Sequence, residues 1–170
     1  KFDNEAISKL ETFSYTQAAM IVPELLSWMQ DPNWPVAGPL QNWLIKNFDA
    51  FQECPHAAAL LQESNTDDDW KNSIVTNIVE CAVEAKLHHP ETMPYTVRKE
   101  SPVLLAVSRI AKSPTKGEVA EGIESVAESV MIELERGAEK LLTPPPVSKG
   151  DGGCNSDECD DALVAEAAAA

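Results

Sequence analysis

Histidine and cysteine side chains are the first candidates for chemistry, because the chain holds few of either. The three histidines are His56, His88 and His89, and Cys54 lies two residues before His56. A thiol beside an imidazole can act as a nucleophile, but residues two apart on a helix point to different sides, and Pro55 lies between these two. His88 and His89 are expected at the carboxyl end of a helix, where an imidazole interacts favourably with the terminal backbone carbonyls. The sequence therefore predicts no catalytic residue and no cofactor.

Tryptophans and aspartates near the predicted turns are the candidates for binding a partner. Indoles offer a large apolar area with one hydrogen-bond donor, and carboxylates attract a basic segment. The candidate partner-binding residues are Trp28, Asp31, Trp34, Asp68, Asp69 and Trp70. Each has a structural alternative, which is core packing for the indoles and helix capping for the aspartates. The sequence alone favours the structural alternative and leaves the binding interpretation open.

The end of the chain carries a second set of chemical groups. Residues 143–153, "TPPPVSKGDGG", predict a proline- and glycine-rich linker between a folded domain of residues 1–142 and a tail of residues 154–170. Cys154 and Cys159 form a local disulfide or remain two free thiols, since a structural zinc site needs more ligands than the tail supplies. No metal site is predicted. The acidic side chains expected to dock on a partner are Asp157, Glu158, Asp160 and Asp161.

Composition restricts the class of partner. The 170 residues are 44% hydrophobic, which is enough for one domain with a core. Thirteen basic and 28 acidic side chains give a net charge of −15, which repels nucleic acid and anionic lipid. No apolar run approaches the roughly 18 residues that span a bilayer, so no membrane insertion is expected. We expect another protein as the partner, either a basic surface or a larger complex. The expected location is a soluble intracellular compartment, with the cytoplasm favoured and an organelle left open.

Helices are predicted nearly everywhere, because apolar residues recur at three- and four-residue steps and no alternating strand pattern occurs. The expected helices cover residues 4–12, 16–30, 34–47, 55–64, 70–87, 103–112 and 118–142. Residues 34–44 and 70–83 are expected to pack side by side. The chain is therefore predicted to be all-α.

The apolar spacing also predicts which faces are buried. The inner faces are expected to be Met20, Ile21, Leu25 and Trp28 in the second helix, Trp70, Ile74, Val75, Ile78, Val79, Ala82 and Val83 in the fifth, and Val119, Ile123, Val126, Val130 and Leu134 in the last. Asn33 is expected to cap the helix that starts near Trp34, with Pro35 in its first turn. Gly38 would let a neighbouring helix approach closely.

Three longer motifs carry a resemblance to known families. "PELLSWMQDPNWPVAGPL" resembles the HEAT-type repeat, in which an acidic turn joins two helices and a valine begins the second. Together with "DDDWKNSIVTNIV" and "RIAKSPTKGEVAEGIESVAESV", the stretch from Asp3 to Leu134 is similar to DUF5071, a domain of unknown function. The resemblance implies an all-helical HEAT-like fold and brings no established activity. Ala37 stands where the HEAT pattern has an arginine, so that inter-repeat contact is not expected.

The resemblance and the helix pattern together predict a short right-handed α-solenoid of about three HEAT-like antiparallel helix pairs. Such solenoids present extended binding surfaces, so the expected function is a non-catalytic protein-binding or scaffold module that uses its helical surface, its acidic tail or both. Two alternatives remain. The chain is a structural accessory subunit of a larger assembly anchored by its tail, or it is a small-ligand-binding protein or enzyme with a tryptophan-lined pocket and His56.

Overall fold

The protein is described here by a computed structural model that covers residues 8–63, 66–91 and 95–142. Within these ranges every regular element is a helix and no strand occurs, as predicted. The helices are α2 (Tyr15–Leu26), η1 (Ser27–Met29), α3 (Ala37–Lys46), α4 (Phe48–Gln52), α5 (Pro55–Gln62), α6 (Asp68–Ile74), η2 (Val75–Glu80), α7 (Cys81–His88), α8 (Pro102–Lys112), α9 (Lys116–Ala120) and α10 (Ile123–Leu142). The η1 segment is a 3-10 turn, whereas η2 is π-helical and joins α6 to α7 in one helical run.

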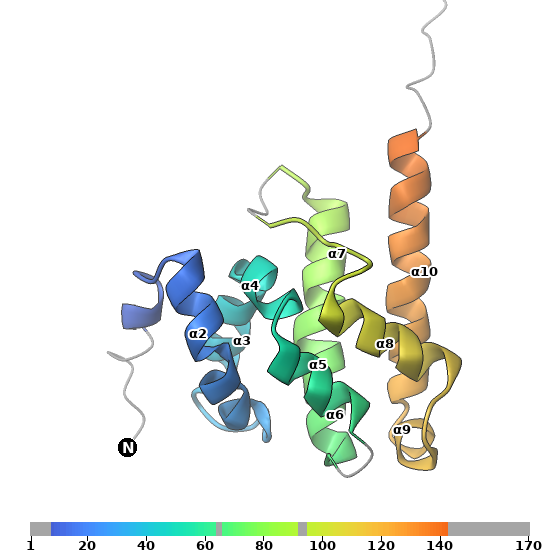
Figure 1. Ribbon diagram of the computed structural model, residues 1–170, viewed down its shortest axis with the longest axis horizontal. Coiled ribbons are helices and arrows are strands. Elements are labelled where there is room, and N and C mark those ends of the chain that lie inside the picture. Colours follow the sequence, from blue (N-terminus) through green and yellow to red (C-terminus); the bar gives the residue numbers. More distant parts are fainter. Residues whose placement is uncertain (1–7, 64–65, 92–94, 143–170) are drawn as a thin grey trace, which may run out of the picture.

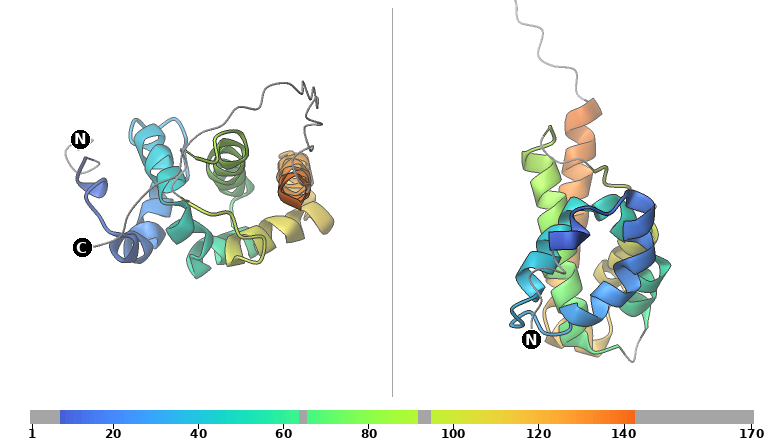
Figure 2. Two further views of the ribbon diagram at one scale, coloured as in Figure 1. Left: turned by 90° about the horizontal axis from the view of Figure 1, so that it is seen from above. Right: turned by 90° about the vertical axis from the view of Figure 1, so that its left-hand side faces the viewer.

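The longer helices lie in two rows. Figure 1 shows them following one another across the molecule, and the left view of Figure 2 shows α2, α5 and α8 in one row, with α3, α7 and α10 in the other. α5 packs against α8, α8 against α10, and α3 against both η2 and α7. The predicted contact between residues 34–44 and 70–83 is therefore present.

The core fills the space between the two rows. Its fully buried large apolar side chains include Leu26, Leu40, Leu44, Phe48, Phe51, Leu61, Ile74, Ile78 and Leu104. The predicted stripe from Ile74 to Val83 on the long helical run is buried, although Trp70 at its start is only partly so. Burying such side chains contributes about 1.5–3 kcal/mol each, which makes this shared core the main source of stability.

The inner face of α2 differs from the prediction. The buried residues are Ala18, Val22 and Leu26 in α2 and Met29 in η1. Of the predicted residues, Ile21 and Leu25 are partly buried and pack against the core, whereas Met20 is 77% exposed and Trp28 is 45% exposed. Both sets of residues have helical spacing, because α2 is apolar almost all round. Contacts of α2 with α4 and α5 select the buried set, and periodicity cannot choose between the two.

The start of α3 also differs from the prediction. α3 begins at Ala37, and the residue before it, Val36, makes no side-chain cap, so Asn33 does not cap the helix. Instead the backbone N–H of Asn33 donates to Asp31 Oδ1 at 2.9 Å, and turns at Asp31 and Trp34 delay the helix. Pro39 then lies in the first turn, where a backbone N–H has no intrahelical partner. A Cβ on Gly38 would meet nothing within 4 Å, so no close helix approach requires this glycine.

The last predicted helix is interrupted. α9 ends at Ala120 and α10 starts at Ile123, with Gly122 between them at φ 72°. This left-handed backbone suits glycine and turns the chain between the two helices. Val119 lies on α9 and is 50% exposed, so its predicted place on the inner face is wrong, whereas Ile123, Val130 and Leu134 are buried.

α4 was not anticipated, and it holds the connection that precedes α8. The buried Gln52 amide donates to the Thr96 carbonyl at 2.6 Å, and its carbonyl accepts from the Arg98 N–H at 2.9 Å. Tyr95 packs against Phe48 with ring centroids 5.5 Å apart and donates its hydroxyl to the Ala82 carbonyl at 2.8 Å. The buried Gln52 side chain thus satisfies two backbone groups of the segment before α8, as a neighbouring β-strand would do.

We predict opposite effects for alanine at two glycines that both have open space where the added methyl group would lie. Gly38→Ala should raise the free energy of unfolding by about 0.5–1 kcal/mol, because alanine favours the helical backbone. Gly122→Ala should lower it by about 1–2 kcal/mol, because the left-handed conformation disfavours a side chain. Urea unfolding of both variants measures this, and effects of the same sign would contradict the backbone assignment.

Candidate functional site

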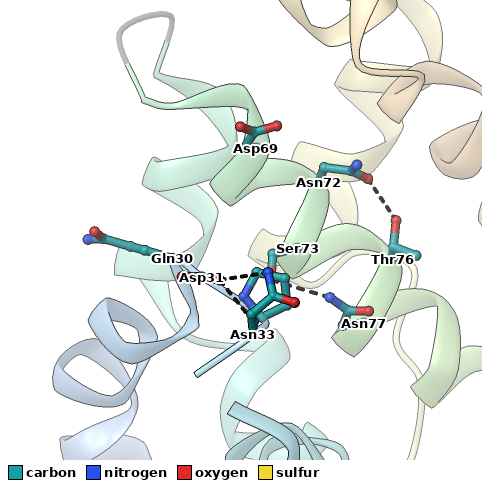
Figure 3. Close-up of a pocket in the computed structure, with 9 residues that line it drawn as sticks. Gln30, Asp31, Asn33, Asp69, Asn72, Ser73, Thr76 and Asn77 are labelled. Carbon is teal, nitrogen blue, oxygen red and sulfur yellow. Dashed lines mark hydrogen bonds between the residues drawn. The ribbon is translucent and has the colours of Figure 1, made fainter. Parts of the chain in front are cut away.

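A polar pocket lies between the α2–α3 connection and the α6–η2 run (Figure 3). Its volume is about 450 Å³, which is within the range of small-ligand sites. One wall is the connection and the other is a helical face. The lining residues are Gln30, Asp31, Pro32 and Asn33 from the first wall, and Asp69, Asn72, Ser73, Thr76 and Asn77 from the second.

The helical wall combines α6 with the π-helical segment. Thr76 Oγ1 donates to Asn72 Oδ1 at 2.9 Å, and Asn77 Nδ2 donates to Ser73 Oγ at 3.3 Å, as Figure 3 shows. The Cys81 thiol donates to the Thr76 carbonyl at 3.5 Å, which satisfies a carbonyl five residues earlier in the chain. π-Helical segments are rare and often occur at functional sites, and this one forms part of the pocket.

The pocket is acidic and rich in acceptors. Asp31 and Asp69 supply its two carboxylates, and no basic side chain is among its lining residues. Asp31 Oδ1 accepts from both the backbone and the side-chain amide of Asn33, at 2.9 and 3.1 Å. The Asp69 carboxylate, in contrast, accepts no hydrogen bond from any residue in the described part of the chain. The pocket therefore favours a ligand that is cationic and donates hydrogen bonds.

The four tryptophans of the chain have different environments. Trp28 and Trp34 flank the pocket-lining connection in sequence and meet edge to face with ring centroids 5.9 Å apart. They are 45% and 38% exposed. Trp43 is buried and donates its indole N–H to the Leu10 carbonyl at 2.8 Å. None of the four lines the pocket, so the predicted tryptophan-lined cavity is not the one described here.

Trp70 fixes the two walls relative to each other. Its indole N–H donates to the Leu26 carbonyl at 3.2 Å, which ties the start of α6 to the end of α2. Of the six predicted partner-binding residues, Asp31 and Asp69 line the pocket, Trp28 and Trp34 flank one wall, and Trp70 braces it. Asp68 belongs to a different cluster.

That cluster is a buried ion network around Glu118. Lys71 and Glu118 are both fully buried, and Lys71 Nζ lies 3.0 Å from Glu118 Oε1. The Arg109 guanidinium donates to both oxygens of the Glu118 carboxylate, at 2.6 and 2.8 Å. Lys71 also lies 3.2 Å from Asp68 Oδ1, and Arg109 donates to the Leu61 carbonyl. The network therefore joins α5, α6, α8 and α9 in the interior.

Sequence reasoning did not identify this network, although it left two signals. Thr115 and Glu118 form a capping box in which the Thr115 N–H donates to Glu118 Oε2 at 2.8 Å and the Glu118 N–H donates to Thr115 Oγ1 at 3.2 Å. Lys71 lies at helical spacing from Ile74 and Ile78 in the buried stripe, where a lone cation requires a partner. A Cβ on Gly117 would approach Asp68 Oδ2 to 1.7 Å, so this glycine makes room for the aspartate.

The Glu118 carboxylate stays ionised in this network. Burial alone raises the pKa of Glu118, but hydrogen bonds from Arg109, Thr115 and Lys71 outweigh it and lower the pKa from 4.5 to about 2. Specific donors thus compensate the charge of the carboxylate. Removing one partner of such a buried ion pair strongly lowers the stability of the fold.

The remaining candidates do not converge. Cys54 is buried at the start of α5, while His56 is exposed in the first turn, so the structure does not pair them. His88 ends α7 and His89 follows it, both exposed, as predicted for a helix terminus. Across residues 8–63, 66–91 and 95–142, no group of three His, Cys, Asp or Glu side chains could hold a metal ion. The tail predictions for Cys154, Cys159, Asp157, Glu158, Asp160 and Asp161, and for residues 143–153, lie outside the described residues.

No helix in the described part of the chain is both long enough and apolar enough to cross a membrane. The exposed large apolar side chains lie on separate elements, so among the described residues no single helical face carries a row of them. They are Phe13, Met20, Trp28, Trp34, Leu105, Val119 and Ile132.

An all-helical domain with a polar pocket between a helix connection and a helical face is the class that the fold and site define. Comparison with protein families matches residues 1–131 to the family described as "Domain of unknown function (DUF5071)". The match covers most of the 170 residues, so the chain belongs to the DUF5071 family, as the resemblance implied. Comparisons of the chain with curated proteins and with solved structures find no match.

We predict that Glu118 stabilises the fold in a pH-dependent way. Because its pKa is lowered in the folded state, its contribution is complete above about pH 4.5 and is lost as the pH falls toward 2. The difference corresponds to about 3 kcal/mol. Glu118→Gln should therefore destabilise the protein strongly near pH 6 and much less near pH 2.5, measured by urea unfolding.

The exposed Glu121→Gln variant is the control, because it removes a carboxylate from the next turn of the chain without touching Lys71 or Arg109. A loss in Glu118→Gln that is independent of pH would show that the ionised form of Glu118 has no special role.

Proposed function

We propose that the chain is a non-catalytic protein-binding module that engages a basic segment of another protein. The proposed binding surface, called the α2–α3 surface below, consists of Trp28, Trp34 and the polar pocket. The observation that carries the proposal is the exposed edge-to-face pair of indoles whose residues flank, in sequence, the connection that forms one wall of the acidic pocket.

The arrangement of helices supports a binding module. The pairs α2–α3, α5 with the α6–η2–α7 run, and α8–α10 are proposed to be three HEAT-like units of a short right-handed solenoid. The connections within successive pairs are adjacent, because the pocket joins the first connection to the start of α6, and the Asp68–Gly117 contact joins α6 to α9. Figure 1 shows α6 and α9 at the same edge. Such an edge can present several turns to one extended partner.

The exposed indoles support recognition of a protein. Trp28 and Trp34 each combine a large apolar area with one N–H donor, and tryptophan is enriched among residues that dominate interface energies. Their 5.9 Å edge-to-face contact orders both rings before binding, which lowers the entropy cost of association. The net charge of −15 and the carboxylates of Asp31 and Asp69 favour a basic partner.

The chemistry of the pocket supports a non-catalytic role. The Ser73 hydroxyl accepts a hydrogen bond from the Asn77 amide, and no imidazole, thiol or amine lines the pocket to take its proton. The other polar lining groups are amides, a threonine hydroxyl and two carboxylates, which suit recognition through hydrogen bonds.

Selection of random peptides of about 12 residues against the full chain tests the proposal. We expect enriched peptides to carry arginine or lysine. Trp28→Ala and Trp34→Ala should each weaken peptide binding by about tenfold or more, measured by calorimetry. Both residues are exposed, so the variants should remain folded by circular dichroism.

Ile132→Ala is the matched control, because Ile132 is an exposed apolar side chain on α10, outside the α2–α3 surface. It should bind the peptides as the unchanged chain does. The proposal fails if no peptide is enriched, or if the two tryptophan variants bind as tightly as the Ile132 variant.

A further inference from the structure

The polar pocket has unused hydrogen-bond acceptors, among them those of two carboxylates. Both Asp69 oxygens, Asp31 Oδ2, Asn77 Oδ1 and Gln30 Oε1 are acceptors that no described donor occupies in the bonds around the pocket. The unused donors are all neutral, namely the amide groups of Asn72 and Gln30, the Ser73 hydroxyl, and one N–H each of Asn33 and Asn77. The charged groups of the pocket are therefore all acceptors, and a ligand that pairs with them must donate hydrogen bonds.

The charge of the pocket selects a cation. Two lining residues are carboxylates and none is basic, so a neutral donor would leave both charges without a counter-charge. The position of the carboxylates matters as well. Asp31 lies on the α2–α3 connection and Asp69 on the first turn of α6, so that a bound group must donate toward two separate walls.

We infer that this pocket binds the guanidinium group of an arginine side chain from the partner protein. A guanidinium is always charged and has five N–H donors that point outward in one plane, whereas an ammonium is a compact charge with three. In this inference Asp31 and Asp69 accept the charge-assisted bonds from the guanidinium, and Asn77 and Gln30 accept the others. The inference rests on the proposed function and names the partner chemistry at the same surface.

The surroundings of the pocket fit an arginine that arrives on a peptide. The pocket-lining connection ends at the exposed Trp28 and Trp34, which offer apolar area to neighbouring residues of the same segment and π-faces to a second cation. The buried Ser73 and its bond to Asn77 hold one acceptor in place before binding. Trp70 keeps the two walls at a fixed separation through its bond to Leu26.

Titration of the full, isotope-labelled chain with N-acetyl-arginine amide tests the inference by nuclear magnetic resonance. The amide signals of residues 30–33 and 69–77 should shift on titration. N-acetyl-citrulline amide, which has the same shape without the charge, should produce no saturable shift, and N-acetyl-lysine amide should bind several-fold more weakly. Equal binding of the citrulline or lysine probe, or shifts confined to other residues, would overturn the guanidinium assignment.

Variants connect the probe to the pocket. Asp69→Asn keeps the shape of the side chain and should weaken arginine-amide binding about tenfold, and Asp31→Asn should have a similar effect. Glu63→Gln is the control, because it removes one exposed carboxylate from the α5–α6 connection without lining the pocket. An equal loss in all three variants would mean that only the net charge acts, and the inference would fail.

The two proposals can fail separately. If selected peptides depend on Trp28 and Trp34 but bind Asp69→Asn normally, the protein-binding proposal stands and the arginine pocket is rejected. If the arginine probe binds in the pocket and no peptide is selected, the pocket is a site for a small guanidinium ligand and the protein-binding proposal is rejected.

Discussion

The buried carboxylate of Glu118 is the constraint on which the arrangement of the central helices depends. A fully buried charge is tolerated only when donors replace the water that it loses. Glu118 accepts four hydrogen bonds, two from Arg109, one from Lys71 and one from the Thr115 backbone, which fills the capacity of a carboxylate. These donors come from α6, α8 and the turn before α9, and Arg109 also binds the end of α5. The position of one side chain thus fixes how four helices meet.

The network also determines where the pocket lies. Asp68 and Asp69 are neighbours in the first turn of α6, yet Asp68 faces Lys71 and Gly117 while Asp69 lines the pocket. The ion network holds one side of α6, and the Trp70 bond to Leu26 holds it against α2 on another. A binding wall supported in this way loses little freedom when a ligand arrives, which is the condition for specific recognition by a few polar groups.

The parts of the structure that sequence could predict are those that depend on local spacing. The buried stripe from Ile74 to Val83 follows from strict helical periodicity, and the family resemblance was confirmed. The face of α2 could not be predicted, because its residues are apolar on both sides and contacts with α4 and α5 decide which are buried. The late start of α3 depends on two turns that compete with the cap at Asn33. The break at Gly122 and the ion network depend on tertiary contacts that no local pattern specifies.

The two polar clusters differ in whether the fold itself uses their hydrogen-bonding groups. The Glu118 network is buried, and its central carboxylate has no acceptor site left for a ligand, so its chemistry is used within the fold. The pocket is open to solvent and keeps acceptors on Asp31, Asp69 and Asn77 that no described side chain occupies. Polar groups that a fold leaves unpaired at a concave surface are stabilised by water until a better partner displaces it. The π-helical turn that places Thr76 and Asn77 in this wall gives up regular helix geometry, and the binding site that we propose gives a physical reason for keeping it there.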